Sequence, residues 1–262
     1  MNPVSHSFSL GRFHLTSISD GAFPVTKNFF FANTPSHIVS HIPNHYHAPL
    51  NVLLIDTGTQ KILIDAGLGS TFAPVAGKLV DHLKTIHVSP GDIQTVIITH
   101  GHLDHIGGLI HSKRPVFPQA QYVLSQEEWD VWESDPSSQE HNILLLLKNC
   151  LTLLPKDAEV FPGVRIIHTP GHTAGHLCVH VNSENNDLLI ASDILNDPAT
   201  LQHLPSHISA EMSPAKGLNT RRKFLKKAHD MSAMVFACHY PFPGLGYINK
   251  RKEKWIWVPH EL

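Results

Sequence analysis

The sequence predicts a mixed α/β (α+β) protein in which two β-sheets pack face to face and helices cover the outside. Strand patterns fall in two separate stretches of the chain, and segments with helical spacing of apolar residues accompany each stretch. No run of Gly, Ser or Pro resembles an interdomain linker, so residues 1–262 are predicted to form a single domain.

The first strand-rich stretch is defined by alternating or wholly apolar runs. The predicted strands are Phe13–Ser19, the hairpin of Val52–Asp56 and Ile62–Asp65, the buried run Thr95–Thr99 and the short Tyr122–Leu124; Lys78–His87 has helical spacing. Asp20-Gly21 is a turn signal after the first strand. Residues 22–49 are rich in Phe, Pro, Asn and His without periodicity, which predicts a long loop near the functional site.

The second stretch follows two predicted helices, of which the first has Ser125 as its N-cap and Glu128 at the capping-box position. These helices are Gln126–Trp132 and His141–Leu153; the later strands are Val164–His168, His176–Val181, Leu188–Ala191, Met234–Cys238 and a closing strand from Tyr247 onward. A last helix is predicted over Pro214–His229, with Ser213 as N-cap and Pro214 at its first position.

Composition narrows the class of protein. A formal charge of −2 argues against a general nucleic-acid binder, and no apolar stretch is long enough to span a membrane. Three widely separated cysteines and the lack of a signal-peptide pattern at the start predict a cytoplasmic protein without disulfides. One basic group is predicted to be the solvated face of the last helix: Arg221, Arg222, Lys223, Lys226 and Lys227.

The chain contains 22 histidines, so position must decide which of them matter. His100, His102, Asp104 and His105 place four potential metal ligands within six residues, directly after a buried strand. His100 and His102 alternate, so both side chains can point the same way while the backbone is extended. Imidazole and carboxylate ligands together suit zinc, iron or manganese.

Three further candidates follow later in the chain. His172 lies at the tip of a Pro-Gly loop, which is not helical, and His168 and His176 on the flanking strands are predicted to be structural. Asp193 ends an apolar run, where a carboxylate can bridge two cations. Strand alternation is expected to send Cys238 and His239 to opposite faces, and the histidine-rich context favours His239 for the site and Cys238 for the core. Three histidines in the irregular segment before the first hairpin are not expected to be ligands: His41, His45 and His47.

The order of these residues, His100-x-His102-x-Asp104-His105 and then His172, Asp193 and His239, resembles the signature of the metallo-β-lactamase superfamily. The resemblance covers about Val52 to Pro241 and implies a four-layer αββα sandwich of two mixed sheets with external helices. Phe13 to Gly21 and His239 to Gly246 are similar to the methyl parathion hydrolase branch, whose near relatives are the quorum-quenching N-acyl homoserine lactonases.

The resemblance implies a dinuclear hydrolase. His100, His102 and His172 would bind one divalent ion, Asp104, His105 and His239 the other, and Asp193 would bridge them. Zinc is the first expectation, with manganese, iron and cobalt open. A water shared by the two ions would ionise near neutral pH and attack a lactone, ester or phosphotriester. Asp104 could also take up the proton. Asn196 stands where lactonases carry a tyrosine that helps the substrate carbonyl, so Asn196 is a candidate catalytic residue whose amide could donate a hydrogen bond there.

Other functions of the superfamily remain open. A mononuclear iron oxidoreductase of the persulfide dioxygenase type and a β-lactamase are the alternatives, since fold does not fix substrate. The substrate is expected to be a small molecule, with no nucleic-acid or membrane partner; the resemblance also suggests a homodimer. An apolar pocket is predicted from six aromatic residues, of which two or three are expected to contact substrate: Phe29, Phe30, Phe31, Trp129, Trp132 and Phe242.

Overall fold

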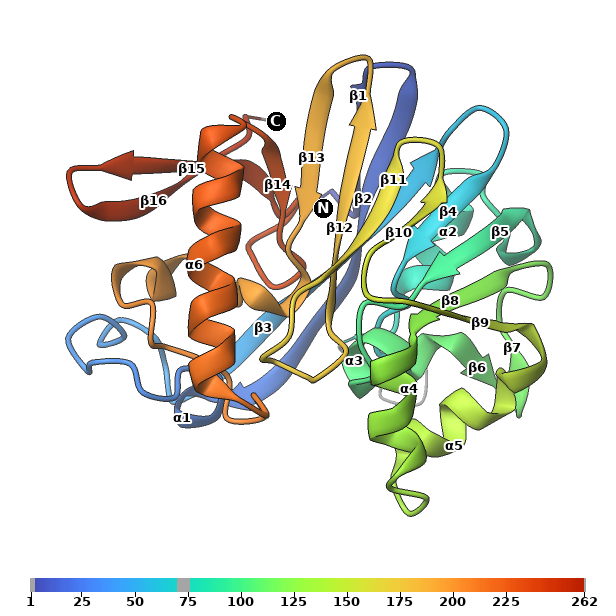
Figure 1. Ribbon diagram of the computed structural model, residues 1–262, viewed down its shortest axis with the longest axis horizontal. Helices are drawn as coiled ribbons and strands as arrows, with labels where there is room; N and C mark the ends of the chain where they lie inside the picture. The colour runs from blue at the N-terminus through green and yellow to red at the C-terminus, as the bar shows by residue number, and fades with distance from the viewer. Residues whose placement is uncertain (1–2, 70–75, 262) are drawn as a thin grey trace.

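A computed structural model describes residues 3–69 and 76–261, and in it two seven-stranded sheets pack face to face (Figure 1). The first sheet contains, in spatial order, β1 (Ser5–Leu10), β2 (Phe13–Thr26), β3 (His45–Asp56), β4 (Lys61–Ile64), β5 (Ile93–Ile97), β8 (Gln121–Ser125) and β9 (Leu151–Leu154). Pairing is antiparallel from β1 to β4 and parallel from β4 to β9, so the sheet is mixed.

The second sheet is formed by the later part of the chain. Its strands, in spatial order, are β10 (Ala158–Phe161), β11 (Val164–His168), β12 (Leu177–Ser183), β13 (Asn186–Ile190), β14 (Met234–Phe236), β15 (Leu245–Arg251) and β16 (Lys254–Pro259). Only the β13–β14 pair is parallel within this sheet. A small hairpin of β6 (Ile110–His111) and β7 (Arg114–Pro115) lies apart from both sheets.

Helices form the outer layers. The α-helices are α1 (Lys27–Phe30), α2 (Leu79–Thr85), α3 (Leu103–Ile106), α4 (Gln126–Glu133), α5 (Gln139–Leu146) and α6 (Pro214–Asp230). Short 3₁₀ turns are η2 (Pro90–Asp92), η3 (Gly107–Leu109), η4 (Lys148–Cys150), η5 (Ser192–Ile194) and η6 (Pro198–Gln202). In Figure 1, α4 and α5 flank the first sheet and α6 flanks the second, which confirms the predicted four-layer sandwich. None of the described helices is long and apolar enough to cross a membrane.

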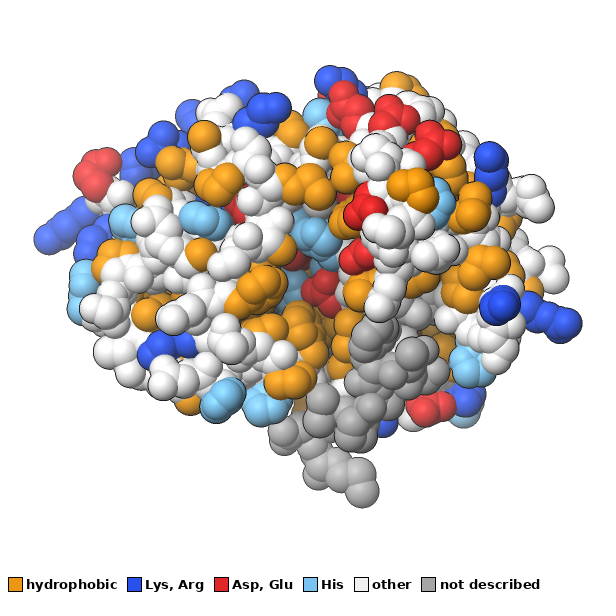
Figure 2. All heavy atoms as spheres, turned by 90° about the horizontal axis from the view of Figure 1, so that it is seen from below, with side chains coloured by type: hydrophobic (Ala, Val, Ile, Leu, Met, Phe, Trp, Pro, Cys, Tyr) orange, Lys and Arg blue, Asp and Glu red, His pale blue; other side chains and the backbone are white. Residues whose placement is uncertain are grey.

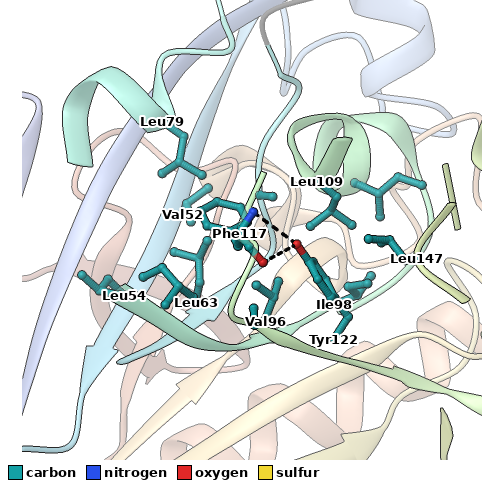
Figure 3. Packing of buried hydrophobic residues seen from close by; sticks show 14 of the residues in the cluster. Val52, Leu54, Leu63, Leu79, Val96, Ile98, Leu109, Phe117, Tyr122 and Leu147 are labelled. Atoms are coloured by element: carbon teal, nitrogen blue, oxygen red, sulfur yellow. Dashed lines mark hydrogen bonds between the residues drawn. The ribbon is translucent and has the colours of Figure 1, made fainter. Parts of the chain in front are cut away.

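Three apolar layers hold this arrangement together. One fills the space between the sheets, one packs the first sheet against α2, α4 and α5, and one packs the second sheet against α6. Figure 3 shows the layer behind the first sheet, where Tyr122 is fully buried. Its hydroxyl donates to Phe117 O over 3.1 Å and accepts from Phe117 N over 3.3 Å, so burial leaves no unpaired phenol.

The prediction of a loop over residues 22–49 is wrong at both ends. Strand β2 continues through the expected turn to Thr26, and β3 begins at His45, with Thr26 paired to His45. The register shifts between Ser19 and Gly21, and this irregularity accommodates Asp20 within the strand. The buried Asp20 carboxylate accepts backbone N–H bonds from Leu68, Gly77 and Leu79, so it ties β2 to the chain ahead of α2 rather than forming a turn.

Three other features differ from prediction: one helix end, one strand and one side chain. The helix expected over His141–Leu153 ends at Leu146, because Leu151–Leu154 pairs in parallel with β8 as the strand β9. A short leucine-rich run does not distinguish a buried helix from a buried strand. Strand β1 has no counterpart in the prediction, and the side chain of Arg221, expected on a solvated helix face, is buried with 2% of its surface exposed.

Candidate metal centre

The seven candidate ligands lie on loops that leave the two sheets at the same end. His100 and His102 follow β5, Asp104 and His105 belong to α3, and the others follow strands of the second sheet: His172, Asp193 and His239. Seen from below the view of Figure 1, the surface is hollowed near its centre, and histidine and acidic side chains gather there (Figure 2). The sheet order therefore brings together residues that are far apart in the sequence.

A first cluster consists of three imidazoles. His102 Nδ1 lies 3.1 Å from His100 Nε2 and 2.8 Å from His172 Nε2, and all three ligand atoms lie within 4.8 Å of one another. Burial holds the pKa of His100 and of His172 well below its ordinary value, so both rings are neutral. Three ring nitrogens that converge at these distances form a donor set suited to a transition-metal cation.

A second cluster combines imidazoles and carboxylates. His105 Nε2 lies 3.5 Å from Asp104 Oδ2 and 3.1 Å from Asp193 Oδ1. His239 Nε2 lies 3.4 Å and 3.2 Å from the same two oxygens. Both Nε2 atoms are buried and make no hydrogen bond. Buried polar atoms are nearly always paired, so two unpaired nitrogens facing carboxylate oxygens fit a cation between them.

The electrostatics of the second cluster favour added positive charge. Burial alone would lower the pKa of His105, but the carboxylates of Asp104, Asp193 and Asp65 hold it well above its ordinary value. Burial opposes ionisation of Asp193, yet the neighbouring His239 and His105 hold the pKa of its carboxyl well below the usual range. The carboxylate is therefore ionised and the pocket favours a cation.

Asp193 joins the two clusters. Its Oδ1 faces His105 and His239, while its Oδ2 lies 3.3 Å from His172 Nε2 in the first cluster. The side chain is 2% exposed, so it has little freedom to turn away. The Asp193 N–H donates to His176 Nε2 over 3.2 Å, and burial lowers the pKa of His176 to about 3, which keeps that ring a neutral acceptor. One carboxylate is thus positioned to bridge two cations.

Contacts behind the clusters fix the orientation of the rings. His105 Nδ1 donates to Asp65 Oδ2 over 2.8 Å, and His239 Nδ1 donates to Pro49 O over 2.9 Å, which directs both Nε2 atoms to the cluster. Asp65 Oδ1 and Oδ2 also accept from the backbone and hydroxyl of Thr99. Such outer partners set the tautomer of metal-binding histidines.

A profile of the metallo-β-lactamase superfamily matches residues 47–239, which include all seven candidate ligands. The chain belongs to the metallo-β-lactamase superfamily. Among its relatives is an N-acyl homoserine lactonase of a Bacillus species, 26% identical over 163 residues, which are 53% of this chain and 60% of the relative. An atrochrysone carboxyl ACP thioesterase of Aspergillus chevalieri is 31% identical over 144 residues, 51% of this chain and 37% of the relative.

Similarity to solved structures extends along almost the whole chain. AidC, a dizinc quorum-quenching lactonase solved with the product N-hexanoyl-L-homoserine, superposes with a TM-score of 0.91 and 25% identity, covering 98% of each chain. In the sequence comparison, the chain described here spans only about 60% of the length of the lactonase relative. The structural similarity to AidC, by contrast, extends over nearly all of both chains.

Cys238 does not lie where strand alternation predicted. Its Sγ is 3.5 Å from Asp193 Oδ1 and belongs to the second cluster by distance, beside His239. Strand β14 ends at Phe236, so the two-residue alternation no longer holds at Cys238. The residue also packs in the apolar layer between the sheets, as expected. Burial raises the pKa of the Cys238 thiol to about 12, which keeps it protonated.

The other histidines near the site have separate contacts. His168 Nε2 donates to Ala174 O over 2.9 Å and lies 2.7 Å from Glu127 Oε2, which ties its loop together. His176 Nε2 accepts a hydrogen bond from the backbone N–H of Asp193, so His176 helps to position a candidate ligand. Within residues 3–69 and 76–261, neither cluster includes His41, His45 or His47.

Only two of the six aromatic residues predicted to form a pocket lie beside the candidate ligands. Phe30 packs its ring 5.7 Å from that of His239, and Trp132 lies 5.8 Å from His102. Phe23 lies 5.9 Å from His239 and was missed, because its segment lacks a recognisable strand pattern. The other predicted positions lie elsewhere: Phe29 is exposed, Phe31 packs in a small apolar cluster with Phe30, Trp129 is in the core behind the first sheet, and Phe242 lines an outer cavity with Trp255 and Trp257.

Asn196 is buried beside the bridging residue. It is 2% exposed, and its Nδ2 donates to Asp193 O over 3.3 Å. In this geometry the amide donor supports the turn that carries Asp193.

Two buried charged residues near the site were not predicted. Glu128, expected in a capping box, accepts no bond from Ser125; its carboxylate instead contacts the loops that carry His100 and His172. Its backbone N–H does donate to Ser125 Oγ, as the N-cap prediction required. Arg221 donates to Ile194 O over 2.9 Å, directly beside Asp193. A sequence shows such residues only as ordinary helix-start and helix-surface charges.

Proposed function

We propose that this chain is a hydrolase that holds two divalent cations and cleaves a cyclic or activated ester of a small molecule, an N-acyl homoserine lactone first of all. The observation that carries the proposal is the position of Asp193, whose two oxygens each face one cluster of ligand atoms. His100, His102 and His172 would hold one cation; Asp104, His105 and His239 would hold the other.

A pair of divalent cations would supply a bridging hydroxide near neutral pH and Lewis acidity toward the substrate oxygen. The residues of the chain do the rest. Asp104 lies at the edge of the second cluster with 17% of its side chain exposed, so it can accept a proton from water and release it to solvent. His105 and His239 are held by Asp65 and Pro49 O, so the site needs little rearrangement before reaction.

The substrate class rests on the flanking aromatic rings and on the relatives. Phe23 and Phe30 lie beside His239, and Trp132 lies beside His102, so apolar surface lies on both sides of the two clusters. This suits a compact polar head with an apolar acyl or aryl group. The relatives include a lactonase, a thioesterase and a structure with N-hexanoyl-L-homoserine. All three involve an acyl carbonyl, which favours carbonyl over phosphoryl substrates.

Zinc is the proposed metal, with manganese, iron and cobalt able to use the same imidazole and carboxylate ligands. A mononuclear iron oxidoreductase would leave one of the two clusters without a role. The link through Asp193 therefore favours the dinuclear hydrolase over that alternative.

The test is a substrate panel with purified, zinc-loaded protein: N-acyl homoserine lactones, aryl esters, phosphotriesters and a β-lactam. We expect lactones and aryl esters to be hydrolysed with a kcat/KM at least about tenfold above that for phosphotriesters, a difference of about 1.4 kcal/mol. Hydrolysis of the β-lactam alone, or oxygen consumption with a persulfide, would show that the proposed reaction is wrong.

A further inference from the structure

We infer that Glu128, in the first turn of α4, is a positioning residue that holds the two loops of the first cluster in register. The inference rests on the metal site of the proposed function, although not on its substrate. The Glu128 side chain is fully buried, and it is separated in sequence from both loops by more than 25 residues.

The two carboxylate oxygens of Glu128 divide four donors between them. Oε1 accepts from the Gly101 N–H over 2.8 Å and from Trp132 Nε1 over 2.7 Å. Oε2 accepts from the Thr173 hydroxyl over 2.6 Å and from the Gly175 N–H over 3.1 Å. No donor is a charged side chain, so the carboxylate acts as an anchor for neutral groups rather than as half of an ion pair.

These donors adjoin the candidate ligands. Gly101 lies between His100 and His102, and Thr173 directly follows His172. One oxygen therefore fixes the backbone between the first two ligands, and the other fixes the loop that carries the third. Since one rigid group bonds to both loops, the distances between these imidazoles depend on its position.

The fit between α4 and the two loops is close. A Cβ on Gly101 would lie 2.1 Å from Trp132 Nε1, and a Cβ on Gly175 would lie 2.1 Å from Glu128 N. Neither glycine has a positive φ, so these positions need glycine for space rather than for backbone conformation. Ser125 completes the contact, because its hydroxyl donates to Gly175 O over 2.7 Å.

The chemistry of the contact requires a carboxylate. An ionised carboxylate is an acceptor at both oxygens, whereas a glutamine of the same shape presents one oxygen and one NH₂ group. In Glu128→Gln, the NH₂ must face either the donors of the first loop or those of the second. Either Gly101 N–H and Trp132 Nε1, or the Thr173 hydroxyl and Gly175 N–H, then lose their acceptor and meet a donor in its place.

The expected consequence is weaker binding of one of the two ions. Loss of outer partners of metal ligands typically reduces metal affinity by about 10–100-fold. We therefore expect Glu128→Gln to bind one zinc ion as the wild type does and the other about 10–100-fold more weakly. Competition with a chromogenic chelator measures both affinities without any substrate.

A matched control separates positioning from stability. Tyr122→Phe removes a buried hydroxyl that bonds to Phe117 in the core behind the first sheet (Figure 3), and neither residue belongs to either cluster. We expect both variants to lower the Tm of the metal-free protein, but only Glu128→Gln to weaken an ion. If both variants keep two ions of wild-type affinity, Glu128 is merely structural and the inference is wrong.

A second pair of variants covers the case in which Glu128→Gln does not fold. Thr173→Val removes one donor to Oε2 at nearly constant volume, and Thr173→Ser retains the hydroxyl. We expect weaker binding of one ion in the first and wild-type affinity in the second; equal affinities would contradict the inference. A wild type that binds two ions but hydrolyses no lactone would refute the proposed function and leave this result unaffected.

Discussion

Individual ligands differ in how many contacts depend on them. His102 contributes one ring nitrogen, but that atom lies within 3.1 Å of both other imidazoles in the first cluster. Its ring is only half-buried, and its neighbour Trp132 packs against it from one side. Its removal therefore opens the first cluster without disturbing the core.

We predict that His102→Ala binds about one metal ion fewer per chain than the wild type and that its rate of hydrolysis falls by more than about 100-fold. Loss of a residue that only hydrogen-bonds to a metal ligand already reduces metal affinity or activity by about 10–100-fold, and loss of the ligand itself should reduce it further. Elemental analysis and lactone hydrolysis check both parts. His45→Ala is the control, because His45 is exposed and lies in neither cluster. Two tightly held ions in His102→Ala would show that the first cluster is assigned incorrectly.

Asn196 offers a test of selectivity. Because its amide donates to Asp193 O, we predict that Asn196→Ala lowers kcat/KM for a lactone and for an aryl ester by the same factor, about fivefold for one hydrogen bond. Kinetics with both substrates measure the ratio. A loss confined to the lactone would mean that the amide acts on the lactone carbonyl after all.

The sequence marks the candidate ligands more clearly than the residues that support them. His100 to His105 are dense enough in a short segment to be recognised, and His172 is marked by the Pro-Gly loop. Glu128 carries no such mark, because its partners are backbone groups and a hydroxyl that only the folded chain brings near. Cys238 packs in the core as predicted but also reaches the second cluster, because alternation holds within a strand and β14 has already ended.

Among the elements, α6 is tied to the site by a buried ion pair. Arg221 donates to Ile194 O, to Leu204 O and, over 3.2 Å, to Glu211 Oε2. Burial raises the pKa of the Glu211 carboxyl, which the Arg221 charge partly offsets. Arg221 thus holds Ile194, the residue after Asp193, against α6.

We predict that Arg221→Met lowers the free energy of unfolding by about 3–5 kcal/mol, because it leaves a buried carboxylate without its partner. Urea unfolding of the metal-free protein measures the loss. The double variant with Glu211→Gln should recover part of it, since the unpaired charge is removed. A double variant no more stable than Arg221→Met would show that the backbone bonds, and not the charge, account for the loss.

Element boundaries were predicted well where apolar periodicity is unambiguous. The strand β4, the buried β5 and the long α6 have the expected type and nearly the expected ends, and β3 ends at Asp56 as expected although it begins seven residues earlier. Residues 22–26 and 45–49 were assigned to a loop because Pro, His and exposed positions obscure the alternation of a strand that lies partly in solvent. The strand β9 depends on pairing with β8, which no local pattern reveals.

For the whole molecule, the site joins the two halves of the sandwich. His100 to His105 leave the first sheet, while His172, Asp193 and His239 leave the second. Strand patterns in two stretches predicted two sheets, and the motif predicted a shared site. The order of the strands in each sheet depends on long-range pairing that the sequence alone does not specify. The same is true of the way the ligand-bearing ends of the two sheets come together.

We predict that chelation of the metal lowers the Tm by roughly 5–10 °C, because ions bound at about 100 times their Kd stabilise the folded state by about 2.7 kcal/mol. Differential scanning calorimetry before and after chelation measures the shift, and added zinc should restore it. An unchanged Tm would mean that no cation links the two halves.

The most direct measurement is a titration of metal-free protein with zinc while hydrolysis of an N-acyl homoserine lactone is followed. Because Asp193 faces both clusters, we predict that activity needs both ions and reaches its maximum at about two zinc ions per chain. Full activity at one ion per chain would contradict the dinuclear site. No hydrolysis at two ions would contradict the proposed function.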